Sequence, residues 1–303
     1  MEGGEKEPAD GFIVRLAYRP PLDWRSLLDF FRRRAISGVE VVDGDAYRRT
    51  IEWEGDVGTL EISPVPRQSR LELRVLARSA GRLADVVPRV RRMFDLDSDP
   101  LDIDAALGGD PLLRRLVRSR PGLRVPGAWD AFETAVRAIL GQQVTIRAAT
   151  TLCGRLVRRF GRPTDDPGRG LTHVFPKPEA LAQAKLEGIG LTRARADTLS
   201  RLARSVATGE LRLDSARGLE DAVRRLDAIP GIGEWTAQYI AMRAFGEPDA
   251  FPVGDLGLRR ALADGGSLPT AAELARRAEA WRPWRAYGAI HLLTSESTNG
   301  ARR

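Results

Sequence analysis

The sequence has very few of the residues that hold metals or cross-link a chain. Its 303 residues include one cysteine, Cys153, and two histidines, His173 and His291. A single cysteine excludes an intramolecular disulfide and a four-cysteine zinc or iron-sulfur site within one chain. Two histidines beside it give little support to a protein-built zinc site. Any chemistry is therefore expected to come from carboxylates, backbone groups or aromatic side chains.

Long apolar runs are missing as well. No stretch approaches the about 18 apolar residues of a membrane-spanning helix, and the first ten residues lack the apolar core of a signal peptide. We therefore expect a cytoplasmic protein. At this length, two or three domains are more typical than one.

Lysine is scarce in a chain that is nevertheless basic. The net charge is +7, and nearly all the basic residues are arginine, since the only lysines are Lys6, Lys177 and Lys185. A basic balance is typical of a protein with a polyanionic partner, although it is equally compatible with mere solubility. No lysine follows Lys185, which limits the chemistry considered below.

Residues 11 to about 100 show the period-two apolar spacing of strands. The segments are FIVRLAY, TIEWEG, GTLEISPV and RLELRVLAR, with turn-forming residues between them. Between the first two, apolar residues recur at helical spacing after Asp23, a good N-cap. This pattern predicts a small α+β domain with an antiparallel sheet.

From residue 110 onward the apolar spacing is helical. Gly141 divides residues 128–160 into two predicted helices, and Thr192 or Leu191 lies near the start of a later one. The other predicted helices cover residues 110–119, 178–190, 219–229, 234–245, 255–263 and 270–295.

The fold class that we predict is α+β, with a small antiparallel-sheet domain followed by two mostly helical domains that contain a helix-hairpin-helix motif. The first domain covers residues 1–103 and the second 130–247. We expect helix 110–119 to pack with the C-terminal helices. The third domain is therefore discontinuous, with residues 104–129 and 248–303.

A glycine turn joins two predicted helices in DAIPGIGEWTAQYIA. Gly231 and Gly233 allow a tight turn, and neither carries a Cβ that would keep a bulky group away. The unpaired N–H groups of the next helix favour an anion, and DNA phosphate is the natural candidate. The alternative is a corner between helices that has no ligand, and the carboxylate of Glu234 counts against a phosphate.

These motifs together resemble a known family. IPGIGEWTAQYIA followed by DAFPVGDLGLRRAL is similar to the hairpin-and-aspartate core of the helix-hairpin-helix DNA glycosylase superfamily. RPGLRVPGAWDAFETAVRAILGQQVT and AWRPWRAYGAIHLL resemble the bacterial DNA-3-methyladenine glycosylase II type. The similarity begins at PPLDWRSLLDFFRRRA and extends nearly to the C-terminus, so it covers most of the chain.

The resemblance implies how the hairpin meets DNA. Gly231, Gly233 and Thr236 would contact a DNA phosphate. The main-chain carbonyls of Asp227, Ile229 and Ile232 would hold a structural Na⁺ or K⁺ when DNA is bound. No other cofactor is expected.

Asp255 follows a Pro/Gly turn and precedes a predicted helix. Taken alone, it reads as an ordinary helix cap. The resemblance makes it the catalytic aspartate. Alkylation makes a purine cationic and therefore a good leaving group, and a carboxylate can stabilise the positive charge that grows on the sugar and can orient or deprotonate the attacking water.

Relatives that also cleave the strand use a lysine nucleophile in the second hairpin helix. That position is Trp235 here, and no lysine follows in the hairpin or beyond it. The resemblance therefore implies a monofunctional enzyme that leaves an abasic site.

Two aromatic residues, Trp235 and Tyr239, lie four apart and share a helix face. Aromatics at this spacing usually belong to a core. The resemblance instead places them in a base pocket with Phe30, where a flipped electron-poor base can stack. Leu256, Leu293 and also Thr294 replace aromatic residues of the best-known bacterial form, which puts the lesion range in doubt.

Extruding a base leaves a hole in the stack that a wedge fills. The family position of the wedge is Gln143, with Gln142 beside it. The alternative is that the two glutamines only satisfy a helix start.

The function that we predict is hydrolytic excision of alkylated purines, of the 3-methyladenine type, from duplex DNA by a monomeric bacterial enzyme near the nucleoid. Two alternatives remain open. One is a glycosylase for oxidised or deaminated bases, and the other is a non-catalytic DNA-binding module of an alkylation-response protein.

Overall fold

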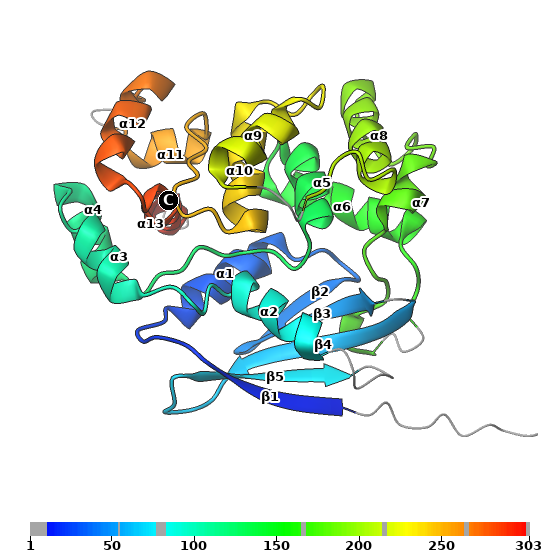
Figure 1. The fold of residues 1–303 in the computed structure, drawn as a ribbon, viewed down its shortest axis with the longest axis horizontal. Helices are drawn as coiled ribbons and strands as arrows, with labels where there is room; N and C mark the ends of the chain where they lie inside the picture. Colours follow the sequence, from blue (N-terminus) through cyan, green and yellow to red (C-terminus); the bar gives the residue numbers. More distant parts are fainter. Residues whose placement is uncertain are drawn as a thin grey trace, which may run out of the picture.

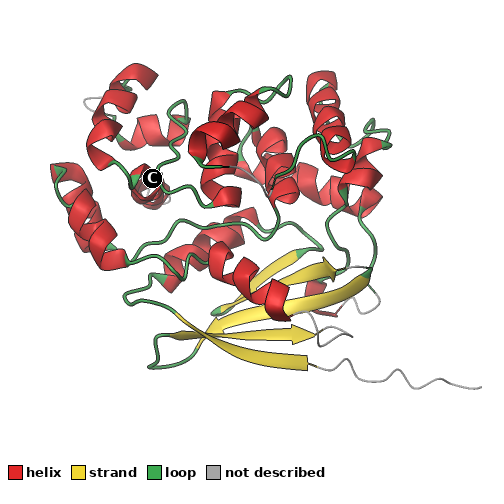
Figure 2. Ribbon diagram, viewed as in Figure 1, coloured by secondary structure: helices red, strands yellow, loops and turns green. Residues whose placement is uncertain are grey.

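The computed structural model describes residues 11–53, 55–76, 83–164, 168–213, 217–263 and 267–300. A sheet lies on one side of the molecule and helices lie over it (Figure 1, Figure 2). The first ten residues and residues 77–78, the end of the last predicted strand, lie outside the described residues. No helix of the described residues is long and apolar enough to cross a membrane.

The sheet has five antiparallel strands in the order β1-β5-β4-β3-β2. Their bounds are β1 Gly11–Ala17, β2 Glu40–Asp43, β3 Ala46–Trp53, β4 Asp56–Pro64 and β5 Arg70–Leu76. The antiparallel sheet that the alternating segments predicted is confirmed.

The hairpin of β2 and β3 was missed by the sequence pattern. Asp43 pairs with Ala46 across a two-residue turn in which Gly44 has φ +55°. The Gly44-Asp45 pair of the turn was an available hairpin signal. The alternation in β3 is obscured because Arg49 is buried, at 2% exposure, with a carboxylate partner on another element.

Three helices belong to the first third of the chain. These are α1 Trp24–Arg34, α2 Leu83–Met93 and α3 Pro100–Leu107. Asp23 caps α1 as predicted, since its Oδ1 accepts from the Ser26 N–H at 3.0 Å. α2 and α3 were not predicted, and Pro88 inside α2 obscures its helical pattern. α1 and α2 pack onto the sheet and share one core with it.

The longer regular elements in the rest of the described chain are helices. The helices are α4 Pro111–Ser119, α5 Ala131–Gly141, α6 Ile146–Phe160, α7 Pro178–Ala182, α8 Arg193–Ala207, α9 Leu219–Asp227, α10 Glu234–Ile240, α11 Leu256–Ala261, α12 Ala271–Ala278 and α13 Arg285–Gly300. The break at Gly141 is confirmed, and Thr192 caps α8. The helix predicted over residues 270–295 is wrong: it is two helices, because Pro283 lacks an N–H donor and interrupts the pattern.

Three apolar cores organise the molecule. One joins the sheet to α1 and α2, a second joins α5, α6 and α8 to the hairpin, and a third joins α4 to α11, α12 and α13. The packing of α4 with the C-terminal helices is thus confirmed. The domain boundaries that we predicted stay a proposal, which these three cores support. Tyr239 packs against both helical cores.

A buried ionic network joins the sheet to α5. Arg49 Nη2 on β3 lies 2.7 Å from Glu133 Oε2, and the other Glu133 oxygen accepts from Arg137 at 2.6 Å. Arg137 also pairs with Glu40 on β2, which accepts from the Tyr47 hydroxyl at 2.6 Å. Burial would raise the pKa of Glu133, but Arg49 and Arg137 outweigh burial and lower it.

Candidate active site

Asp255 is the N-cap of α11, and both of its carboxylate oxygens accept hydrogen bonds. Oδ1 accepts from the backbone N–H groups of Gly257 at 2.7 Å and Leu258 at 3.2 Å, so the capping role is real. Oδ2 accepts from Trp235 Nε1 at 3.1 Å. The side chain is half-buried. The cap therefore fixes the carboxylate with its second oxygen turned toward the hairpin helix.

Trp235 and Tyr239 form a stacked pair on α10. Their ring centroids are 5.6 Å apart, and the ring planes differ by 17°. Both side chains are half-buried, as expected for aromatics that cover a core yet keep accessible surface. Trp235 lies two residues after Gly233 and donates to Asp255. The aromatic pair therefore lies between the hairpin turn and Asp255. Figure 1 shows α10 next to α11 on one side and α5 on the other.

Phe30 reaches this group from α1. Two guanidinium groups lie against its ring, with the Arg34 Cζ at 3.8 Å and the Arg243 Cζ at 4.4 Å from the centroid. Arg243 Nη1 donates to the Tyr239 hydroxyl at 2.7 Å. The structure thus brings together the three predicted aromatic residues, although they are two hundred residues apart in sequence.

Both arginines were missed by the sequence reasoning. Arg34 follows Phe30 by four residues and Arg243 follows Tyr239 by four, a spacing that places each pair on one helix face. Burial would raise the pKa of the Tyr239 hydroxyl, but the charges of Arg243 and Arg34 outweigh burial and lower it. The end of the site farther from Asp255 is therefore positively charged.

The hairpin turn connects α9 to α10. Gly231 has φ +96°, and a Cβ there would lie 1.9 Å from the Thr198 hydroxyl oxygen on α8. Gly231 is therefore required by the turn and by its packing on α8. Gly233 is exposed, and among the described residues nothing lies within 4 Å of the place of its Cβ. The space for an approaching group is at Gly233.

The structure gives Gln142 another role than that of a wedge. Its Nε2 donates to the Gly231 carbonyl at 2.9 Å and to the Thr236 hydroxyl at 3.0 Å, so it joins the end of α5 to the hairpin. Thr236 is 3% exposed as a whole residue, and the phosphate contact predicted there stays a prediction. Gln143 is exposed with φ +54° and stays the predicted wedge.

The predicted cation ligands lie in the same turn. The Ile229 carbonyl already accepts from the Ile232 N–H at 2.9 Å. Within the described part of the chain, the carbonyls of Asp227, at the end of α9, and Ile232, in the turn, accept no backbone hydrogen bond from outside the helices. Oxygen ligands of this kind suit a hard cation, and the cation site stays a prediction.

The two leucines lie on either side of the aspartate cap. Leu256 begins α11 and is 47% exposed. Leu293 on α13 places its Cδ2 2.8 Å from where a Cβ on Gly257 would be. Thr294 follows and is half-buried. The wall beside Asp255 is therefore aliphatic on the α13 side.

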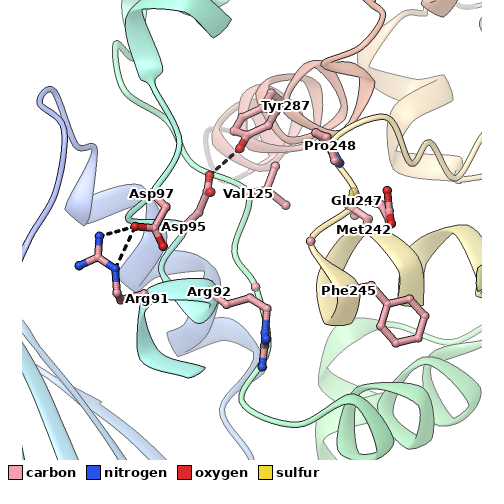
Figure 3. Close-up of a pocket in the computed structure, with 12 residues that line it drawn as sticks. Arg91, Arg92, Asp95, Asp97, Val125, Met242, Phe245, Glu247, Pro248 and Tyr287 are labelled. Carbon is pink, nitrogen blue, oxygen red and sulfur yellow. Dashed lines mark hydrogen bonds and ion pairs between the residues drawn. The ribbon is translucent and has the colours of Figure 1, made fainter. Parts of the chain in front are cut away.

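A pocket of about 210 Å³ lies elsewhere, where α2, α13 and the π-helical turn Ala241–Phe245 meet (Figure 3). Among the described residues that line it, Asp255 and Trp235 do not occur. Asp95 lies at its rim in the left-handed region, with φ +52°, and accepts from the Tyr287 hydroxyl at 2.8 Å. Burial raises the pKa of Asp95 to about 6, against the lowering effects of Tyr287 and Arg124.

Asp95→Asn should stabilise the protein at neutral pH. Because the folded pKa is raised, the carboxyl contributes stability below its unfolded pKa, and that contribution is lost as the pH rises through about 6. Asparagine mimics the neutral form, accepts from Tyr287 and tolerates a positive φ. We expect a gain on the order of 1–3 kcal/mol at pH 7.5 that shrinks toward pH 4.5. Urea unfolding at both pH values measures it; a loss at pH 7.5 would contradict the burial argument.

Two known protein families match consecutive parts of this chain. The AlkA N-terminal domain family matches residues 13–130, and the family of HhH-GPD superfamily base excision DNA repair proteins matches residues 136–286. DNA-3-methyladenine glycosylase 2 of Escherichia coli K12 is 34% identical, over 94% of this chain and 98% of that protein. The chain belongs to the HhH-GPD superfamily.

A further curated protein and a solved structure are also similar to this chain. A probable bifunctional transcriptional activator/DNA repair enzyme AlkA of Mycobacterium tuberculosis H37Rv is 40% identical over 93% of this chain, and the chain spans 56% of its length. A 3-methyladenine DNA-glycosylase from Archaeoglobus fulgidus superposes with a TM-score of 0.80 at 25% identity, covering 94% of this chain and 98% of that one. The helix-hairpin-helix fold that the sequence predicted is confirmed.

Proposed function

We propose that this superfamily member is a monofunctional DNA glycosylase that hydrolyses the N-glycosidic bond of alkylated purines, of the 3-methyladenine type, in duplex DNA. The observation that carries the proposal is the Asp255 carboxylate, which is oriented by its cap and by Trp235. Trp235 is one ring of the stacked pair and follows Gly233 of the hairpin by two residues. The names of the E. coli and A. fulgidus relatives support the same substrate class. Its partner would be duplex DNA in the cytoplasm, met as a monomer.

The reaction needs little from the protein beyond placing one negative charge. The bond from the sugar carbon to the purine nitrogen breaks, and its electron pair neutralises the cationic base. Asp255 stabilises the positive charge that remains on the sugar. A water oxygen then bonds to that carbon, and its proton passes to the Asp255 carboxylate and to solvent. The Trp235 and Tyr239 rings would stack on the extruded base.

DNA would be held by the hairpin and the turn after α5. The open space at Gly233 lets a phosphate approach the first N–H groups of α10. Na⁺ or K⁺, when bound, would supply a positive charge between the hairpin carbonyls and that phosphate. Gln143, exposed at the end of α5, would enter the stack that the base has left.

Incubation of the purified protein with methylated DNA, followed by chromatography of the free bases, tests the proposal. We expect 3-methyladenine to be released and the strand to stay intact until alkali is added. Borohydride should trap no protein-DNA adduct, because Trp235 occupies the lysine position. Release of only oxidised or deaminated bases, or binding without release, would favour the alternatives.

A further inference from the structure

Two arginines without a carboxylate partner among the described residues lie at the end of the candidate site farther from Asp255. Arg34 and Arg243 both lie against the Phe30 ring and both act on the Tyr239 hydroxyl. Among the described residues no carboxylate forms an ion pair with either one. Two like charges close together and partly out of water are unfavourable unless something negative shares the space.

The surrounding fold accounts for only one of them. Arg243 is 7% exposed and donates to the Pro126 and Gly127 carbonyls and to Tyr239, so it joins the linker before α5 to α10. Arg34 has fewer partners: it interacts with the Tyr239 hydroxyl, which Arg243 shares, and its guanidinium lies against the face of the Phe30 ring.

Arg34 keeps its charge in this setting. Burial lowers its pKa to about 10, and the Arg243 charge acts in the same direction. A pKa of about 10 still leaves the guanidinium protonated at neutral pH. The aromatic site therefore has a carboxylate at one end and a cation, accessible in part to solvent, at the other.

We propose that Arg34 is a specificity residue that sets the preference between neutral and cationic lesion bases, by favouring the departure of a base that leaves with a negative charge. The inference rests on the proposed glycosylase function. A neutral purine departs with the electron pair of the broken bond and is negatively charged until it gains the proton that the attacking water releases. A guanidinium lowers the energy of that charge, whereas it repels a base that is already cationic.

The reaction on a neutral base balances without any further reactant. The sugar-nitrogen bond breaks toward the base, the water oxygen bonds to the sugar carbon, and the proton of that water moves by way of Asp255 to the base nitrogen. Arg34 takes part by its field and by donating hydrogen bonds to acceptors on the base. Asp255 keeps the same task for both kinds of lesion.

Arg34→Gln tests the inference on duplexes that contain either hypoxanthine or 7-methylguanine. Both bases carry a carbonyl, but hypoxanthine is neutral and 7-methylguanine is cationic. We expect single-turnover excision of hypoxanthine to fall about tenfold or more, with 7-methylguanine unchanged or faster. Arg34→Lys should recover much of the hypoxanthine activity, because it restores the charge. Arg33→Gln is the control, because it removes one positive charge at an exposed position outside the site. It should leave the ratio of the hypoxanthine and 7-methylguanine excision rates unchanged.

The outcomes separate the inference from the function on which it rests. An equal fall on both duplexes would give Arg34 a merely structural role and overturn the inference. Wild-type release of 7-methylguanine with no hypoxanthine release would also overturn it, and would leave the glycosylase function intact. If the wild-type protein is folded and binds DNA but releases neither base, the proposed glycosylase function itself is wrong.

Discussion

Asp255→Asn should abolish base release while the protein still folds and binds DNA. Asparagine is as good an N-cap as aspartate, so its side-chain oxygen can still accept from the Gly257 and Leu258 N–H groups. What disappears is the negative charge that faces the cationic sugar, together with the hydrogen bond from Trp235 Nε1, which the asparagine nitrogen cannot accept. Removal of one electrostatic contact to a transition state typically costs 10²–10³-fold, and loss of a full charge should cost at least about that much.

Single-turnover assays on methylated duplex DNA measure this effect. Asp102→Asn, an exposed carboxylate in the first turn of α3, is the matched control and should leave the rate unchanged. Gel-shift affinity and the melting temperature should match wild type in both variants. Retained release by pure Asp255→Asn protein would place the chemistry on another residue.

The helical half of the fold was predictable because its pattern is local. Gly141 and Thr192 mark helix ends by their own chemistry, and Asp255 precedes a helix as a capping residue does. The sheet was harder, because Arg49 interrupts the alternation of β3. Its burial depends on Glu133, 84 residues later, and no local pattern encodes such a partner.

The candidate site was predictable only where a motif named the residue. The hairpin motif led to Gly231, but the packing of Thr198 against that glycine comes from a separate helix. The two glutamines look equivalent in sequence, yet one is hydrogen-bonded to the hairpin and the other is exposed. Arg34 could have been noticed by its spacing from Phe30, but only the fold shows that Arg243 lies on the same ring.

Glu133→Gln should destabilise the fold strongly. The substitution leaves buried Arg49 and half-buried Arg137 to share the Glu40 carboxylate, and breaking a buried ion pair by removing one member costs about 3–5 kcal/mol. Urea unfolding at pH 7 measures the loss. Glu179→Gln, at an exposed position in α7, is the control and should change stability by no more than about 0.5 kcal/mol.

A second variant separates the stabilisation that the Arg49–Glu133 ion pair provides from the cost of leaving one charge buried without a partner. Replacing both members, Arg49→Met with Glu133→Leu, leaves Arg137 paired with Glu40 and should recover most of the stability that Glu133→Gln loses. The coupling between the two sites in a double-mutant cycle should then be about 2 kcal/mol or more. If the single and double variants lose equal free energy of unfolding, the unpaired buried charge contributes little. The hydrogen bonds of the network between the sheet and α5 would then account for the loss.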